Sequence, residues 1–160
     1  MRILNLVENE EGVPDCEAAH GLSFYVETQN HKLLFDTSPS DVVLRNAERL
    51  GVDLTAVDTV ILSHGHYDHS GGIMAFTEIN PRAKIYMQHN AGGEFYAFDG
   101  EYKGFRYIGI DKRILDLPQV TLLHGDTKLD DELQIFTVDK RALPLPSTNA
   151  RLRELCGGQY

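Results

Sequence analysis

Alternation of apolar and polar residues predicts strands at the start of the chain. Residues 22–28 (LSFYVET) are rich in β-formers, and residues 32–36 (KLLFD) form a second apolar run. The short polar stretch between them suits a tight connection, so the two runs predict a β-hairpin. Residues 2–7 alternate in the same way and predict a strand before this hairpin.

Two segments carry the spacing of helices instead. The first stripe consists of Val42, Val43, Leu44, Ala47 and Leu50, and the second of Ile73, Met74, Phe76 and Ile79. Ser38 or Ser40 is placed to cap the start of the first helix, and Gly51 stands where its C-terminal cap belongs. Asn80-Pro81 is expected to end the second helix, because the residue before a proline avoids the helical region.

The remaining apolar runs predict strands at residues 58–64, 84–88, 120–123 and 133–138, the last two joined by a turn near Asp130-Asp131. Residues 90–109 are aromatic and glycine-rich and give no clear assignment, and the prolines before residue 147 predict an irregular tail. The order of elements is typical of a mixed α/β fold. In such folds ligand sites follow buried strands, and the run over residues 58–64 ends on a histidine.

Composition narrows the class of protein. The chain has 160 residues, 42% of them hydrophobic and 24% charged, which suits one globular domain. Its formal net charge of −9 argues against non-specific binding of nucleic acid. Cys16 and Cys156 form no CxxC pair, no signal peptide is recognisable at the start, and no run has the length of a membrane span. We therefore expect a cytoplasmic protein with reduced cysteines.

The stretch HGHYDH concentrates four potential metal ligands, namely His64, His66, Asp68 and His69. In extended backbone, residues two apart point to the same side, so His64 and His66 can reach one ion, and Gly65 allows a tight bend between them. Asp68 and His69 lie past the bend and can face a second ion. Imidazole and carboxylate suit zinc, and also iron or manganese. Four potential ligands in six residues indicate a metal site rather than a loop of solvated histidines.

This motif resembles the H-x-H-x-D-H signature of the metallo-β-lactamase superfamily. Residues 33–38 (LLFDTS), residues 19–27 (AHGLSFYVE) and the SGG after the motif are similar to the branch that includes dihydropterin-related synthases. The resemblance covers roughly residues 1–146. It implies an α/β fold, the αββα sandwich built of two similar halves. It also implies two zinc ions and a metal-bound hydroxide that attacks an ester, phosphoester or amide-type substrate.

The resemblance also assigns roles to residues. His64 and His66 are expected to bind the first ion, and Asp68 and His69 the second. Asp68 is further expected to act in catalysis by orienting the nucleophilic water. Asp36, at the end of its strand, matches a family residue that supports the metal loop from outside, and a simple strand-end carboxylate is the alternative.

The other histidines carry weaker expectations. His20 lies in the family-like AHGLS segment and is a candidate pocket residue, with a structural role as the alternative. His89 follows a predicted strand and is a second candidate for the pocket, although a structural role is favoured. His31 is expected to be solvated in a hairpin turn, and His124 to lie in a turn after a strand.

The resemblance implies further ligands, two His and a bridging Asp, from a second half of the fold. No matching segment is recognisable, and residues 147–160 contain neither His nor Asp. We therefore expect a domain over residues 1–146, the N-terminal half of the sandwich with an incomplete second half, followed by the irregular tail at residues 147–160. A truncated form, a natural short variant and a protomer that completes its site with another chain all fit.

The expected function is a metal-dependent hydrolase that carries part of a dinuclear site and acts on a small-molecule substrate. The alternative is a non-catalytic metal-binding or oligomerisation module derived from the same fold. The missing half would leave an apolar sheet face exposed, and exposed apolar faces seek partners. We therefore expect a homo-oligomer, most simply a two-fold dimer, with no nucleic-acid or membrane partner.

Overall fold

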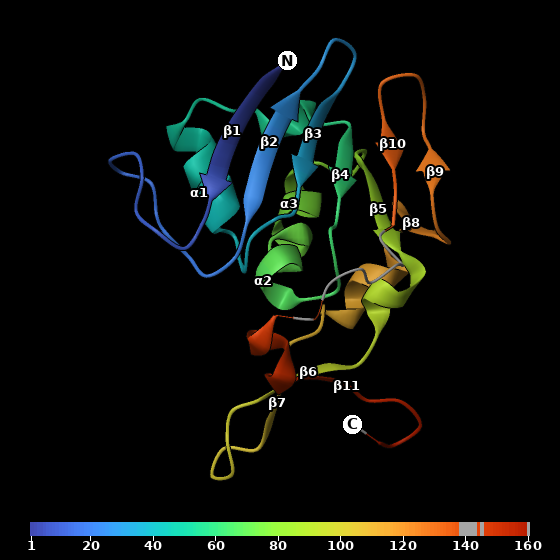
Figure 1. Cartoon of the computed structure of the whole chain (residues 1–160). Helices are drawn as coiled ribbons and strands as arrows, with labels where there is room; N and C mark the ends of the chain where they lie inside the picture. Colours follow the sequence, from blue (N-terminus) through green and yellow to red (C-terminus); the bar gives the residue numbers. More distant parts are fainter. Residues whose placement is uncertain (138–143, 145, 160) are drawn as a thin grey trace.

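The computed structural model describes residues 1–137, 144 and 146–159, and its largest unit is a six-stranded mixed sheet (Figure 1). In spatial order the strands are β1 (Arg2–Val7), β2 (Ser23–Glu27), β3 (Lys32–Phe35), β4 (Thr59–Ile61), β5 (Lys84–Gln88) and β8 (Val120–Leu123). The first three pair antiparallel, and β3, β4, β5 and β8 run parallel. Parallel pairing brings the carboxyl ends of β3 and β4 side by side.

Helices cover one face of this sheet. They are α1 (Val42–Arg49), α2 (Tyr67–Ser70) and α3 (Ile73–Ile79), accompanied by the 3₁₀ helices η1 (Leu54–Ala56), η2 (His89–Gly92) and η3 (Lys112–Asp116). A fourth 3₁₀ helix, η4 (Ser147–Arg151), lies outside this layer and buries none of its residues. Leu34, Val60 and Ile85 of the sheet and Phe76 of α3 are fully buried in the core between the layers. Each such side chain contributes roughly 1.5–3 kcal/mol relative to exposure.

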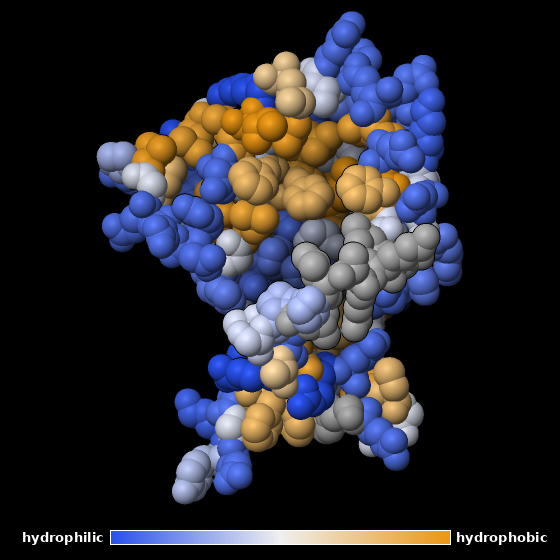
Figure 2. Space-filling view, in the orientation of Figure 1, coloured by the Kyte–Doolittle hydropathy of each residue, from blue (hydrophilic) through white to orange (hydrophobic). Residues whose placement is uncertain are grey.

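The opposite face of the sheet is only partly covered. The strand registers place Phe24, Phe35, Ile61 and Tyr86 in one row across β2, β3, β4 and β5, and all four are half-buried. Side chains alternate along a strand, so this row points away from the helices. Figure 2 shows hydrophobic residues gathered on the face turned to the viewer, with hydrophilic residues around them. We call this row and its surroundings the open face.

A small hairpin, β9 (Thr127–Lys128) with β10 (Gln134–Ile135), lies beside the sheet (Figure 1). Glu132 in its turn accepts hydrogen bonds from the Thr28 hydroxyl (2.5 Å) and from the side-chain amide of Asn30 (2.5 Å). These contacts fasten the hairpin to the connection between β2 and β3.

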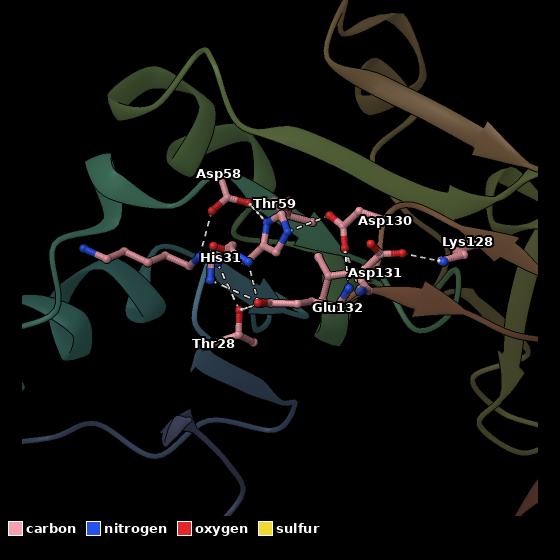
Figure 3. Close-up of polar contacts among 11 residues, drawn as sticks. Thr28, His31, Asp58, Thr59, Lys128, Asp130, Asp131 and Glu132 are labelled. Atoms are coloured by element: carbon pink, nitrogen blue, oxygen red, sulfur yellow. Dashed lines mark hydrogen bonds and ion pairs between the residues drawn. The ribbon is translucent and has the colours of Figure 1, made fainter.

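His31 strengthens the same junction (Figure 3). Its Nδ1 lies 2.9 Å from Asp58 Oδ1 and its Nε2 lies 2.7 Å from Asp130 Oδ2. The side chain is 20% exposed. The expectation of a solvated turn residue is therefore wrong, because the distant hairpin supplies a carboxylate that the local sequence does not reveal. We call His31, Asp58 and Asp130 the hairpin cluster.

A second sheet contains β6 (Phe95–Phe98), β7 (Phe105–Tyr107) and β11 (Leu152–Glu154), with β6 in the centre. It contains two strands of the segment left unassigned by sequence, residues 90–109. It also corrects the irregular tail, since β11 pairs with β6 through Leu152 and Ala97. The prolines before residue 147 end one segment without preventing a strand after them.

Most of the predicted elements of the first 123 residues are confirmed, with differences at their ends. Asp41, not Ser38 or Ser40, precedes α1 and makes no side-chain cap, whereas Gly51 has the expected left-handed conformation with a φ of +66°. The strand predicted over residues 133–138 is shorter and pairs with β9 instead of following β8 directly. Its last residue, Val138, lies outside the described residues. None of the helices within the described residues is long and apolar enough to cross a membrane.

Candidate metal centre

The HGHYDH motif occupies the loop after β4 and the short helix α2 that follows it (Figure 1). The His66 carbonyl accepts hydrogen bonds from Ser70 Oγ (2.9 Å) and from the backbone N–H of His69 (3.2 Å). Gly65 packs so closely that an added Cβ would lie 2.1 Å from the Ala91 carbonyl oxygen. Only glycine fits there without a backbone shift, and the loop is held on both sides of its ligand-type side chains.

Three imidazole rings of the motif lie together. His64 Nε2 is 3.1 Å from His66 Nδ1, and the ring centroids of His64 and His69 are 4.2 Å apart. Asp68 Oδ2 lies 3.7 Å from His69 Nε2. Two donor atoms bound at about 2.0–2.1 Å to a tetrahedral zinc are separated by roughly 3.3 Å. The donor separations within the two expected pairs are therefore compatible with metal binding.

Asp36 lies fully buried behind the motif, at the carboxyl end of β3. Its Oδ1 accepts the backbone N–H of Ser63 (2.8 Å), and its Oδ2 accepts the Ser63 hydroxyl (2.7 Å) and Nδ1 of His69 (2.6 Å). The φ of Asp36 is +59°, a left-handed conformation that Asp and Asn tolerate better than most residues. One carboxylate thus joins β3, the end of β4 and α2.

Electrostatics favour neutral rings at two of the three histidines. Burial and the neighbouring His69 and His66 lower the pKa of His64 to about 4, and burial also lowers the pKa of His66. Burial alone would lower the pKa of His69, but its hydrogen bond to Asp36 and the charges of Asp36 and Asp68 outweigh it and raise the pKa. Neutral imidazole is the form that binds a metal ion.

His20 stands at the rim of the motif. Its Nε2 is 3.5 Å from Asp68 Oδ2, its Nδ1 is 2.9 Å from Asn9 Oδ1, and its side chain is 77% exposed. Gly21 permits this approach, because its φ is +146° and an added Cβ would lie 2.1 Å from the Asp68 carbonyl oxygen. The AHGLS segment therefore packs directly on the metal loop.

His89 lies elsewhere. Its ring stacks on His124 with centroids 4.4 Å apart, and its Nδ1 is 3.3 Å from the Leu123 carbonyl oxygen. The structure does not bring His89 to the HGHYDH motif.

A cavity of about 560 Å³ opens beside His64, between the open face and β10. Phe35, Ile61 and Tyr86 line it from the sheet, and Phe95 lines it next to the motif. The rings of Phe95 and His66 have centroids 5.6 Å apart. Neither His20 nor His89 is among the lining residues.

Sequence reasoning missed Ser63, and it did not single out Phe95 within the aromatic segment that contains it. Ser63 stands between the apolar strand and the first ligand-type histidine, and that position was the available signal. Phe95 comes from the aromatic segment that sequence left unassigned, and its place depends on the pairing of β6 with β7 and with the distant strand β11.

The donors of the motif come as pairs. Within residues 1–137, 144 and 146–159, no group of three or more His, Cys, Asp or Glu side chains is arranged to hold one metal ion. A catalytic zinc usually has three protein ligands and an open position.

Comparison with known proteins decides the family. The model of the metallo-beta-lactamase superfamily matches residues 17–146. The chain belongs to the metallo-beta-lactamase superfamily. The crystal structure of Tm1679, a metal-dependent hydrolase of the beta-lactamase superfamily, has a TM-score of 0.77 and 25% identity, covering 98% of this chain and 54% of that chain. The expected metallo-β-lactamase-like fold is confirmed.

Two relatives from Methanocaldococcus jannaschii are similar in sequence. An uncharacterized protein is 37% identical over 120 residues, which are 72% of this chain and 45% of the relative. A 7,8-dihydropterin-6-methyl-4-(beta-D-ribofuranosyl)-aminobenzene-5'-phosphate synthase is 34% identical over 89 residues, which are 52% of this chain and 30% of that enzyme. The chain therefore spans about half the length of these relatives, or less.

Proposed function

We propose that this chain carries part of the site of a metal-dependent hydrolase that acts on a small molecule. The observation that carries the proposal is the clustering of His64, His66, Asp68 and His69 at the end of a buried strand, with donor pairs 3.1 and 3.7 Å apart. Membership of the metallo-beta-lactamase superfamily supports it. His64 and His66 are proposed to hold one ion, and Asp68 and His69 the second. Zinc suits these donors, and iron or manganese can replace it.

Individual residues of the chain are proposed to have separate roles in the hydrolysis reaction. Zinc, when bound, supplies Lewis acidity and lowers the pKa of a coordinated water to about 7. Asp68 accepts a hydrogen bond from the attacking water and orients it toward an ester, phosphoester or amide-type group. Asp36 holds His69 in place through the 2.6 Å hydrogen bond to its Nδ1. The cavity beside His64 offers apolar walls for the uncharged part of a substrate.

Metal binding is the first test. The purified chain is titrated with zinc against a chelating dye, alongside His66→Ala and a control, His124→Ala. His124 is a matched control because its ring stacks on His89 outside the motif. We expect the His66 variant to lose affinity and the His124 variant to retain that of the wild type. Equal affinity for all three proteins would refute the metal site.

Turnover separates the proposed function from its alternative, a metal-binding or oligomerisation module without activity. The pairwise arrangement of donors in the described residues favours weak metal binding and little activity of this chain alone. Zinc-loaded protein is assayed on generic ester, phosphodiester and lactam substrates, with Asp68→Asn as the control. Turnover that is lost in the Asp68 variant supports the hydrolase, whereas zinc uptake without turnover supports the module.

Self-association is proposed as well, through the open face and with a second copy of the chain. The match covers only 54% of the solved relative, so that protein has a further segment nearly as long as the matched part. Nothing within the described residues of this chain covers the row around Phe24 completely. Phe24→Asp should shift the protein toward monomer in sedimentation velocity. Ile79→Asp is the control, because Ile79 is 44% exposed on α3 in the helix layer. A wild-type protein that is monomeric at all concentrations would contradict this proposal.

The cellular location of the protein is inferred only from the state of its cysteines. Cys16 and Cys156 are both unpaired thiols. Reduced cysteines are usual inside cells, and we propose a cytoplasmic protein on that basis.

A further inference from the structure

Ser63 lies between the buried Asp36 and the first ligand-type histidine. Its backbone N–H and its hydroxyl both donate to Asp36, at 2.8 and 2.7 Å, and its Oγ is also 2.9 Å from His64 Nδ1. A serine hydroxyl has one proton to donate, and an ionised carboxylate can only accept. The Ser63 proton therefore points to Asp36, and the hydrogen bond to His64 must be donated by the ring.

This order of donors fixes the ring of His64. Nδ1 carries the proton, so Nε2 has a free lone pair. Nε2 is also the atom that faces Nδ1 of His66 across 3.1 Å. The tautomer of a metal-binding histidine is set by the hydrogen bond of its other nitrogen.

The same carboxylate acts on the other half of the site. Asp36 Oδ2 accepts Nδ1–H of His69 at 2.6 Å, so His69 Nε2 is the nitrogen that faces Asp68. Asp36 therefore reaches one histidine of each donor pair, His69 directly and His64 through Ser63.

We propose that Ser63 is a positioning residue that passes the orientation set by Asp36 to His64, so that one buried carboxylate organises the donors for both ions. This inference rests on the proposed function, because it concerns the readiness of His64 to bind metal. It adds a residue that the HGHYDH motif does not contain. Without the Ser63 hydroxyl, Nδ1 of His64 would have no fixed partner among its present contacts, and the ring could protonate at either nitrogen.

The tautomer of His64 in metal-free protein is the direct test. Long-range ¹⁵N–¹H NMR spectra distinguish Nδ1–H from Nε2–H rings, and they need neither metal nor activity. We expect the Nδ1–H form of His64 in wild type and in Ser63→Thr, which keeps the hydroxyl. Ser63→Ala should lose this preference, while the His69 ring stays in its Nδ1–H form because its bond to Asp36 remains.

Zinc titration gives the second readout. Ser63→Ala should lower zinc affinity by about 10–100-fold, the usual effect of removing an outer hydrogen-bond partner of a metal ligand. Ser63→Thr should restore the affinity of the wild type. Circular dichroism and thermal unfolding check that all variants fold.

The outcomes separate this inference from the proposed function. If His66→Ala loses zinc binding but Ser63→Ala keeps both the wild-type tautomer and the wild-type affinity, the role of Ser63 is wrong and the metal site stands. If His66→Ala binds zinc as well as wild type, the proposed function itself fails.

Discussion

Two histidine–aspartate clusters stand at opposite ends of the same pair of parallel strands. At the amino ends of β3 and β4, His31 bonds to Asp58 and, from the hairpin, to Asp130. At their carboxyl ends, Asp36 bonds to His69 and to Ser63, which contacts His64. Both clusters use the same residue types at hydrogen-bond distance. Their chemistry differs because of burial and because of which ring nitrogens remain free.

In the hairpin cluster both ring nitrogens of His31 face carboxylates, so no lone pair is left for a metal. Asp58 and Asp130 are 42% and 41% exposed, and water screens their charges. In the candidate metal centre the carboxylate of Asp36 is fully buried, and each histidine that it orients keeps one nitrogen without a carboxylate at hydrogen-bond distance. A histidine close to carboxylates is therefore a candidate ligand only when one of its nitrogens is unused.

The largest expected effect comes from removing the charge of the buried carboxylate. Asp36→Asn keeps a residue that tolerates a φ of +59° but puts an amide N–H₂ group where donors now point. Zinc affinity should fall by about 10–100-fold. The free energy of unfolding of the metal-free protein should fall by about 1–3 kcal/mol, the cost of an unsatisfied buried donor. Dye competition and urea unfolding measure the two effects.

Asp58→Asn is the matched change in the hairpin cluster. It should leave zinc affinity unchanged, because Asp58 contacts His31, Lys32 and Thr59 and none of the motif residues. If Asp36→Asn kept the zinc affinity of wild type, or if both variants lost affinity equally, the two clusters would not differ in their role in zinc binding.

The candidate metal centre was more predictable from sequence than the hairpin cluster. His64, His66, Asp68 and His69 are close in the chain, so the backbone of one loop is enough to bring them together. Asp36 was within reach because it ends an apolar run and the resemblance pointed to it. His31 and Asp130 are 99 positions apart, and their contact depends on how β9 and β10 return to the sheet. No local sequence pattern predicts a contact between residues so far apart in the chain.

The same limit explains the errors elsewhere. Local apolar runs are enough to predict β1, β3 and β5. In contrast, β6 and β11 pair with each other across more than fifty residues, and they lie in segments that are rich in glycine or preceded by prolines. Ser63 was overlooked for a different reason. Serine before a histidine is an ordinary dipeptide, and only the three-dimensional position of Asp36 gives its hydroxyl a role.

The smallest expected effect is the pH dependence of the hairpin cluster. The hydrogen bond to Asp58 outweighs burial and, together with that to Asp130, raises the pKa of His31. The pKa values of Asp58 and Asp130 are lowered, so both stay ionised near neutral pH. Because the folded pKa of His31 lies above the unfolded value of about 6.5, its contribution to stability is complete below that pH. It is lost as the pH rises through the folded pKa.

His31→Gln cannot titrate, so its free energy of unfolding should fall below that of wild type at about pH 6, by no more than about 1 kcal/mol for such an exposed cluster. The difference should shrink toward about pH 9 as wild-type His31 loses its proton. Urea unfolding of both proteins across this range measures it, with zinc affinity of the variant as a check that the metal centre is untouched. A difference that stays constant with pH would show that the charge of His31 does not hold the hairpin, and that its two hydrogen bonds act as neutral contacts.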